Sequence, residues 1–332
     1  MNRNAGATVL LTDRAWPDDT VERSVIESAG LRLVAGPAEA AAASTIEHLV
    51  AEHEPAAVLT CWAPVSAEAI TASPALRVVS RMGVGLDNID VDVATANGVL
   101  VTNVPDYCVE EVSDHAVALV LAWTRGIVTA AREVRAGRWE PATARLRRLS
   151  TLTCGVVGFG RIGRLTARKL TGLGARVVAS DPSPPPDTGS IPMLSLDELL
   201  AGSDVVVLHA PLVPATHHLI GSRELSLMPP GGLLVNVSRG GLVDTSALIE
   251  ALTSGHLGGA GLDVLESEPA VPPELREHPA AVITPHIAFS SDASVEQLRR
   301  SAAEEVVRVL TGQPPRNPCN RPELVTTAGG RR

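Results

Sequence analysis

The sequence predicts an α/β protein of two domains, each built around a parallel β-sheet. Three observations predict this class. The chain has 332 residues, which suits two domains that each bury a core of their own. Short apolar runs alternate with helix-like segments, and this alternation implies parallel strands covered by helices on both faces. Finally, the glycine pattern Gly158, Gly160 and Gly163 ends an apolar run and opens a helix.

The first domain is expected to contain five short strands and the helices between them. The apolar runs predict strands at residues 9–11, 31–35, 57–60, 76–80 and 99–103, with helices at 18–28 and about 45–53. Ser66 and Asp90 precede further helical patterns and are predicted N-caps. No glycine-rich phosphate turn follows the opening strand of this domain.

A long helix is predicted at residues 109–136, between the two sheets. Glu110 and Glu111 lie in its first turn and Gly137 follows its end, which suits the helix dipole and the usual C-terminal stop. Its stretch 116–123 is too apolar for a free surface helix. We expect that stretch to be buried against the second sheet, a partner subunit, or both.

The second domain is expected to contain six strands and a final helix that follows them. The predicted strands are 153–158, 175–180, 204–209, 232–237, 259–264 and 281–284, and the last helix is 292–310. Ser195 and Glu198 have the spacing of a capping box, and Asp244 is a predicted N-cap.

Composition and charge exclude several classes of protein. Hydrophobic residues make up 45% and aromatic residues only 2%, which indicates a globular core of aliphatic side chains. The net charge of −9 argues against a nucleic-acid partner, and the one dense basic run, residues 145–148, is short and is expected to be a solvated loop.

The cysteines and the apolar runs bear on metal binding and location. Cys61, Cys108, Cys154 and Cys319 are scattered, without the spacing of a zinc site, so we expect no metal and a reducing cytoplasm. The N-terminus lacks the pattern of a signal peptide, and no apolar run approaches the ~20 residues that a membrane span needs. We therefore expect no membrane partner.

The glycine pattern at 158–163 predicts a dinucleotide site. In such a turn the first glycine allows the bend, the second lets the backbone approach a pyrophosphate, and the third lets the helix pack on the strand. The next strand ends at Asp181, about 20 residues beyond the first glycine, where an acid binds the adenosine ribose. A turn that merely packs a helix on a sheet is the alternative. An aspartate there favours NAD over NADP, because it repels a 2′-phosphate.

Polar residues gather at the carboxyl ends of the later strands, where ligands bind in parallel sheets. Arg239, Glu268 and His286 follow successive strands. Each alone is explicable as a surface ion pair, but together they match the needs of hydride transfer to a 2-oxo acid. An arginine pairs with the carboxylate, a histidine donates the proton, and a glutamate keeps that histidine charged.

With these motifs, the chain resembles the D-isomer-specific 2-hydroxyacid dehydrogenase family. The resemblance covers roughly residues 76–311, and its motifs are 81–90, 158–163, 209–212, 235–240, 261–264, 268–269 and 284–286. It implies that Arg239 binds the substrate, that His286 is the acid/base and that Glu268 orients it. It also implies that the backbone amides of Val84 and Gly85 hold the substrate carboxylate.

The resemblance further implies the cofactor contacts. Asp263 would anchor the nicotinamide amide and Asp181 the ribose, with Arg239 and His286 also near the cofactor. The other implied contacts are Gly158, Phe159, Gly160, Arg161, Ile162, Gly163, His209, Ala210, Pro211, Thr216, Val237, Ser238 and Ala288.

The architecture implied by the resemblance is a Rossmann-type, doubly wound NAD-binding domain, 104–289, inserted into a flavodoxin-like substrate domain, 1–103 plus 290–332. The last helix then returns to the first domain. The protein is expected to be a homodimer through the coenzyme domain, with helix 109–136 at its centre.

Two other functions stay open at this point. The segments 103–111 and 286–291 look closer to the branch that contains the C-terminal-binding corepressors, which suggests an NAD-sensing interaction protein with vestigial activity. A formate- or phosphite-type dehydrogenase is the third possibility, although residues 81–90 lack the lysine expected for phosphite.

The substrate is predicted from one loop. Family members that use 3-phosphoglycerate carry arginines where this chain reads Thr60, Cys61 and Trp62. A phosphate without a cationic partner keeps its desolvation cost, so we expect a small or apolar unphosphorylated 2-oxo acid. The Trp62 indole either borders the side chain of the substrate or only packs within its own loop. The identity of the acid, the direction of the reaction and the pathway stay open.

Overall fold

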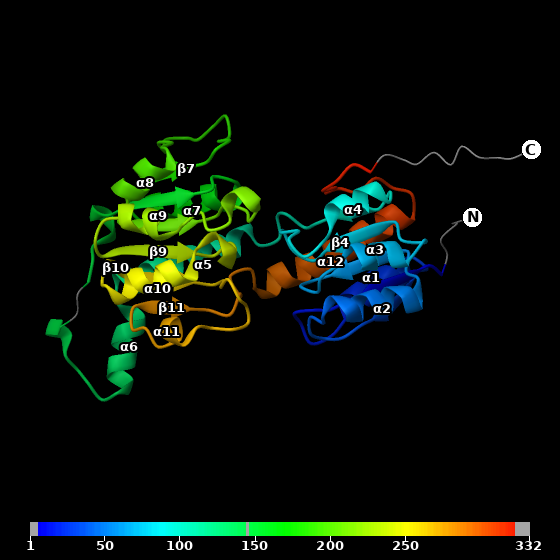
Figure 1. Cartoon of the computed structure of the whole chain (residues 1–332), viewed down its shortest axis with the longest axis horizontal. Helices are drawn as coiled ribbons and strands as arrows, with labels where there is room; N and C mark the ends of the chain where they lie inside the picture. Colours follow the sequence, from blue (N-terminus) through cyan, green and yellow to red (C-terminus); the bar gives the residue numbers. More distant parts are fainter. Residues whose placement is uncertain (1–5, 144–145, 323–332) are drawn as a thin grey trace, which may run out of the picture. The chain divides into compact units, whose positions relative to one another are not determined.

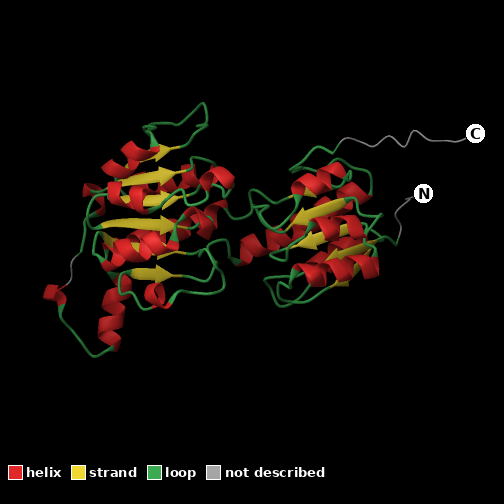
Figure 2. Cartoon of the chain, in the orientation of Figure 1, coloured by secondary structure: helices red, strands yellow, loops and turns green. Residues whose placement is uncertain are grey.

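The computed structural model describes residues 6–143 and 146–322. The chain divides into two compact units. The first unit comprises Met1–Tyr107 together with Ser291–Arg332, and the second comprises Cys108–Ser290. Within each unit a layer of strands is flanked by helices (Figure 2). The second unit is therefore a single insertion into the sequence of the first.

The first unit contains a five-stranded parallel sheet of order β2-β1-β3-β4-β5. This is the flavodoxin-like order. Figure 1 shows this unit in blue and cyan, with its C-terminal segment in orange and red. All five expected strands are present, with ends shifted by a residue or two. They are β1 Thr8–Leu11, β2 Arg32–Ala35, β3 Ala57–Thr60, β4 Val78–Arg81 and β5 Leu100–Thr102.

Among the described residues of the first unit the helices are α1 Thr20–Ser28, α2 Ala43–His53, α3 Ala67–Ala72, α4 Val91–Ala96 and α12 Asp292–Leu310. The two predicted caps are confirmed, because Ser66 accepts a hydrogen bond from the N–H of Ala69 and Asp90 accepts one from that of Val93. The last helix has the predicted bounds.

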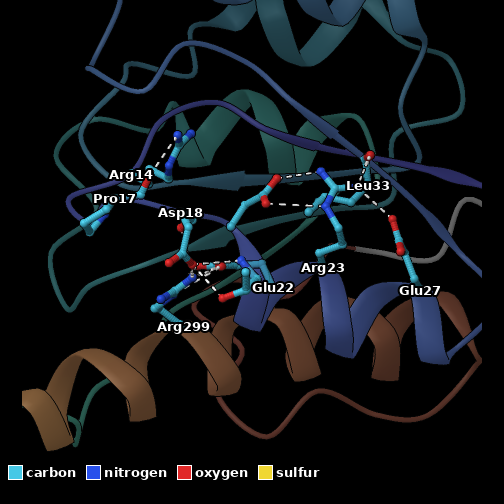
Figure 3. Close-up of polar contacts among 10 residues, drawn as sticks. Arg14, Pro17, Asp18, Glu22, Arg23, Glu27, Leu33 and Arg299 are labelled. Atoms are coloured by element: carbon cyan, nitrogen blue, oxygen red, sulfur yellow. Dashed lines mark hydrogen bonds and ion pairs between the residues drawn. The ribbon is translucent and has the colours of Figure 1, made fainter.

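A buried ion pair joins α12 to α1 (Figure 3). Arg299 Nη2 lies 2.8 Å from Oε2 of Glu22, whose side chain is fully buried, and 2.9 Å from Oδ1 of Asp18. The guanidinium also lies over the Trp16 ring, 5.3 Å from its centroid. Since a buried charge needs a partner, this pair specifies how the C-terminal helix packs within the first unit.

The second unit contains a six-stranded parallel sheet of order β11-β10-β9-β8-β6-β7. Its strands are β6 Thr153–Val157, β7 Arg176–Ser180, β8 Val205–Leu208, β9 Gly232–Asn236, β10 Leu257–Leu262 and β11 Ala281–Ile283. From β6 the chain moves outward to β7 and then returns to β8 on the other side of β6. The strand order therefore reverses between β6 and β8, where doubly wound sheets bind their ligands.

The helices of the second unit are α5 Val109–Thr124, α6 Ile127–Arg135, α7 Arg161–Gly172, α8 Leu196–Gly202, α9 Ser222–Leu227, α10 Thr245–Thr253 and α11 Pro273–Arg276. The predicted capping box of Ser195 with Glu198 and the N-cap Asp244 are confirmed. None of the helices in the described parts of the chain has the length and apolar character needed to cross a membrane.

The prediction of one long helix over 109–136 is wrong. The helix ends at Thr124, and Gly126 adopts a left-handed conformation with φ of 59° before α6 begins. Ala116 and Val120 are fully buried, and the Trp123 indole N–H donates to the carbonyl of Gly258. The apolar stretch 116–123 therefore packs on the second sheet.

The expectation of a solvated basic loop is also wrong for Arg147. Its guanidinium lies 4.0 Å from the centroid of the Trp123 ring and donates to the carbonyl of Gly231 at 2.9 Å. Burial lowers the pKa of Arg147. Arg145, in the same run, lies outside the described residues.

Candidate active site

The glycine turn after β6 has the geometry of a phosphate-binding loop. Gly158 has φ of 91°, and a Cβ there would lie 2.6 Å from the backbone nitrogen of Ala210. A Cβ on Gly163 would lie 2.0 Å from the carbonyl oxygen of Gly158, so the helix packs directly on the turn. A Cβ on Gly160 would have no atom within 4 Å. The second glycine thus borders open space, as close approach by a pyrophosphate requires.

The turn lies at the switch point of the sheet and touches the predicted ribose acid. Asp181 Oδ2 accepts a hydrogen bond of 2.7 Å from the N–H of Phe159, and Oδ1 accepts one of 2.8 Å from that of Ser183. Gly160 is the N-cap of α7 and provides no side-chain cap. The first N–H groups of α7, including those of Ile162 and Gly163, are therefore suited to an anion. These features fit a dinucleotide.

The segment after β8 forms the other side of the switch point. His209 Nε2 is buried and has no hydrogen-bond partner among the described residues. Burial lowers the pKa of His209 to about 4, so its ring is neutral at neutral pH. The Ala210 carbonyl accepts a bond from the Ser238 hydroxyl at 2.6 Å. The Thr216 hydroxyl donates to the carbonyl of Pro211 at 2.7 Å, and this hydrogen bond stabilises the turn between the two residues.

The acid/base candidates His286 and Glu268 form a pair. Glu268 Oε2 lies 2.8 Å from His286 Nδ1, and Glu268 Oε1 accepts a bond of 2.9 Å from the N–H of Leu265. His286 has φ of 53°, a conformation that is unfavourable outside glycine and is typical of functional sites. Because Glu268 engages Nδ1, Nε2 is the nitrogen that can exchange a proton with a substrate.

The surroundings of Glu268 keep it ionised. Burial raises its pKa, but the hydrogen bond and charge of His286, the N–H of Leu265 and the charge of Arg239 lower it more. The pKa of Glu268 therefore lies below its usual value. Its ionised carboxylate can accept a hydrogen bond from an N–H at Nδ1 of His286.

Asp263 holds the turn that carries His286. The residue is 2% exposed, and its carboxylate oxygens accept hydrogen bonds from the hydroxyl of Thr284 at 2.6 Å and the N–H of Ala288 at 2.8 Å. His115 Nε2 lies 3.0 Å from the same Thr284 hydroxyl. The resemblance assigned Asp263 to the cofactor. Sequence reasoning gave no role to Thr284, although it stands within the motif 284–286, and it missed His115. No spacing pattern identifies His115, which belongs to α5.

Arg239 follows β9 in a braced turn. Asn236 donates to the carbonyl of Arg239 at 2.9 Å and accepts from the N–H of Ser238 at 3.1 Å. A Cβ on Gly240 would lie 1.9 Å from the carbonyl carbon of Leu265, so this turn packs against the segment that leads to Glu268. Val237 is buried beneath it. Sequence reasoning missed Asn236, although it stands within the motif 235–240.

The loop of Val84 and Gly85 belongs to the first unit. Asn103 donates to the carbonyl of Val84 at 2.7 Å, and Arg81 Nε donates to Asn88 at 3.1 Å. Within the described residues the N–H groups of Val84 and Gly85 donate no hydrogen bond. Both groups are therefore available to an anion.

The loop of Trp62 is held by Asp13, a residue that sequence reasoning missed. The fully buried carboxylate of Asp13 accepts bonds from the N–H groups of Cys61 at 2.9 Å, Trp62 at 2.7 Å and Ala63 at 3.1 Å. Trp62 is 38% exposed. Burial raises the pKa of Cys61 to about 12, so its thiol stays neutral. The sequence offers one indication of this role, namely that Asp13 is an acidic residue two positions after the end of β1.

The predicted site residues are thus divided between the units. Arg239, Glu268, His286 and the cofactor candidates gather at the carboxyl ends of the second sheet, while Val84, Gly85 and Trp62 belong to the first unit.

The chain is similar to several known proteins. The model of the family described as "D-isomer specific 2-hydroxyacid dehydrogenase, NAD binding domain" matches residues 117–288. D-3-phosphoglycerate dehydrogenase of Mycobacterium bovis is 41% identical over 269 residues, which are 80% of this chain but 50% of the relative. The chain therefore spans about half the length of that relative. Glyoxylate reductase of Thermococcus litoralis is 36% identical over 79% of this chain and 82% of its own length.

Among solved structures, a D-lactate dehydrogenase from Aquifex aeolicus complexed with NAD and lactic acid has a TM-score of 0.82 and 30% identity, over 92% of this chain and 96% of that one. Fold, motifs and relatives agree, and the chain belongs to the D-isomer-specific 2-hydroxyacid dehydrogenase family.

Proposed function

We propose that the protein is an NAD-dependent oxidoreductase that interconverts a 2-oxo acid and a D-2-hydroxy acid. The observation that carries this proposal is the His286–Glu268 pair at 2.8 Å, in the same unit as the open glycine turn. NAD, when bound, supplies or accepts the hydride. The second unit is assigned to NAD and the first to the substrate.

The chain's own residues then have distinct roles. In reduction, the proton on Nε2 of His286 passes to the carbonyl oxygen of the substrate, while Glu268 stabilises the charged ring through Nδ1. Arg239 pairs with the substrate carboxylate by two parallel hydrogen bonds. The N–H groups of Val84 and Gly85 are assigned to the carboxylate as well.

A substrate screen tests this proposal. Purified protein with NADH is assayed against glyoxylate, hydroxypyruvate, pyruvate, longer 2-oxo acids and aryl-pyruvates, and turnover of at least one is expected. NADH-dependent binding of a protein partner without turnover of any of these acids supports the corepressor-like alternative instead.

The cofactor is expected to be NADH rather than NADPH. Asp181 adjoins the glycine turn through the N–H of Phe159, and its carboxylate repels a 2′-phosphate. We expect kcat/KM to be at least about tenfold lower with NADPH, which corresponds to ~1.4 kcal/mol. The substitution Asp181→Ser should reduce the ratio of kcat/KM with NADH to kcat/KM with NADPH. Equal or better turnover with NADPH in the wild-type protein contradicts the assignment.

Phosphorylated substrates are expected to be poor. The loop of Thr60, Cys61 and Trp62 offers a hydroxyl, a neutral thiol and an indole rather than a cation, so a dianionic phosphate there lacks charge-assisted hydrogen bonds. Hydroxypyruvate and 3-phosphohydroxypyruvate are compared with NADH. A higher kcat/KM for the phosphorylated compound shows that the loop binds phosphate after all.

A homodimer through the second unit is the expected assembly. Ile127 and Val134 on α6 are 55% and 52% exposed, and Trp139 beyond it is 82% exposed. Such a cluster of large apolar side chains is unusual on a monomer and typical of an interface. Sedimentation should give a dimer at micromolar concentration, and Ile127→Asp with Trp139→Ala should give a monomer. A wild-type monomer contradicts the proposal.

We also assign the protein to the cytoplasm. Its four cysteines are free thiols, and three of them are buried, as a reducing compartment allows.

A further inference from the structure

Three metal-ligating side chains of the second unit lie outside the proposed catalytic set. They are His217 and His218, which follow the short turn Pro214–Thr216, and Glu266, which follows β10. One ligand atom from each residue lies within 4.8 Å of the other two. The two imidazole rings are adjacent, with centroids 4.0 Å apart. Segments that are distant in the sequence thus bring three ligand atoms together.

The backbone of His218 explains why consecutive histidines point to the same side. In an extended chain, neighbouring side chains point to opposite sides. His218 instead has φ of 52°, in the left-handed region that non-glycine residues rarely adopt. Its N–H donates to the carbonyl of Gly241 at 2.8 Å, which holds this conformation. Such strained residues cluster at ligand sites.

Glu266 is oriented by a neighbour that is not a ligand. Its Oε2 accepts a hydrogen bond of 2.7 Å from the hydroxyl of Thr245, which directs Oε1 to His218 Nε2 at 2.6 Å. A carboxylate with one oxygen held by a hydroxyl and the other directed to an imidazole resembles the outer-shell support of metal ligands.

We propose that His217, His218 and Glu266 form a binding site for a divalent transition-metal ion. Two imidazoles and one carboxylate suit Zn²⁺, Co²⁺ or Ni²⁺, whereas Mg²⁺ and Ca²⁺ prefer oxygen ligands alone. The ion takes the place of the proton between His218 and Glu266, and solvent completes its coordination. The spacing of potential ligands along the chain predicts no metal site, because Glu266 is 48 residues from His218 in the sequence.

Direct titration tests this site. Full-length protein without an affinity tag, stripped by a chelator, is titrated with Zn²⁺ by calorimetry and with Co²⁺ by absorption. We expect one equivalent to bind, with a cobalt spectrum that lacks thiolate charge-transfer bands and so excludes Cys319. His217→Ala, His218→Ala and Glu266→Gln should each weaken binding by at least about tenfold.

Two control variants make the result decisive. His48 is an exposed histidine whose Nε2 lies 3.8 Å from the carboxylate of Glu52, and it belongs to the first unit, so His48→Ala should leave the zinc affinity unchanged. His286→Ala should also leave it unchanged, which separates this site from the proposed catalytic pair. Thermal unfolding of each variant reports whether the fold is intact.

Three results overturn the proposal. These are the absence of saturable Zn²⁺ binding, wild-type affinity in folded His217→Ala, and loss of binding in His286→Ala. The last places the ion at the catalytic pair. None of these outcomes depends on turnover of a 2-oxo acid.

Discussion

His286→Ala is expected to lower kcat by about 10²- to 10⁴-fold, the usual contribution of a general acid/base. The imidazole is the proton donor in the proposed reaction, and its Nδ1 is already engaged by Glu268 at 2.8 Å. Because the turn that carries residue 286 is held by Asp263, the KM for NADH should change much less than kcat. Steady-state rates with the best 2-oxo acid of the screen measure this effect. A kcat within a few-fold of wild type excludes His286 as the proton donor.

The matched comparison is Glu268→Gln, which keeps the shape of the side chain and removes its charge. Glu268 acts through His286, so this variant should retain more activity than His286→Ala. Without the carboxylate the charged imidazole is less stable, and the rate of reduction should decline from a lower pH than in the wild type. A pH–rate profile identical to that of the wild type removes Glu268 from the mechanism.

Arg239→Lys is expected to lower kcat/KM for the 2-oxo acid by at least about tenfold, because a charge-assisted hydrogen bond contributes ~1.5–3 kcal/mol. Lysine keeps the charge but loses the planar fork that pairs with both carboxylate oxygens. The turn of Arg239 is braced by Asn236 and Gly240, so lysine begins from the same backbone position.

The control for that substitution is Arg176→Lys. Arg176 is exposed at the start of β7 and donates only weakly to the carbonyl of Thr151 at 3.4 Å. The Arg176→Lys variant should have the wild-type kcat/KM for the 2-oxo acid. If Arg239→Lys also retains wild-type kcat/KM, bidentate binding of the carboxylate by this arginine is wrong.

Local features of the fold were predictable from the sequence, because neighbouring residues determine them. The caps Ser66, Asp90 and Asp244 and the capping box of Ser195 hydrogen-bond within three residues of themselves. The strand ends moved by only a residue or two, because apolar runs mark strands well and their ends poorly.

The break at Gly126 was not predictable. Glycine inside a helical pattern costs only about 1 kcal/mol relative to alanine, so packing decides whether the helix continues. Here Trp123 is held by Gly258 and Arg147, and the chain turns immediately afterwards. The exposed apolar residues that we assign to the dimer interface consequently belong to α6 and the segment beyond it, rather than to the stretch 116–123.

By itself the sequence determined the identity of the chemical groups: the glycine turn, Asp181, and the arginine, glutamate and histidine that follow successive strands. Only the tertiary structure revealed the contacts between segments that are distant in the sequence. Asp13 binds a loop 48 to 50 residues away, Asp263 binds a turn 24 to 25 residues away, and Arg299 pairs with Glu22 across 277 residues. A buried carboxylate must find donors wherever the fold brings them, and one sequence does not record which distant segment that is.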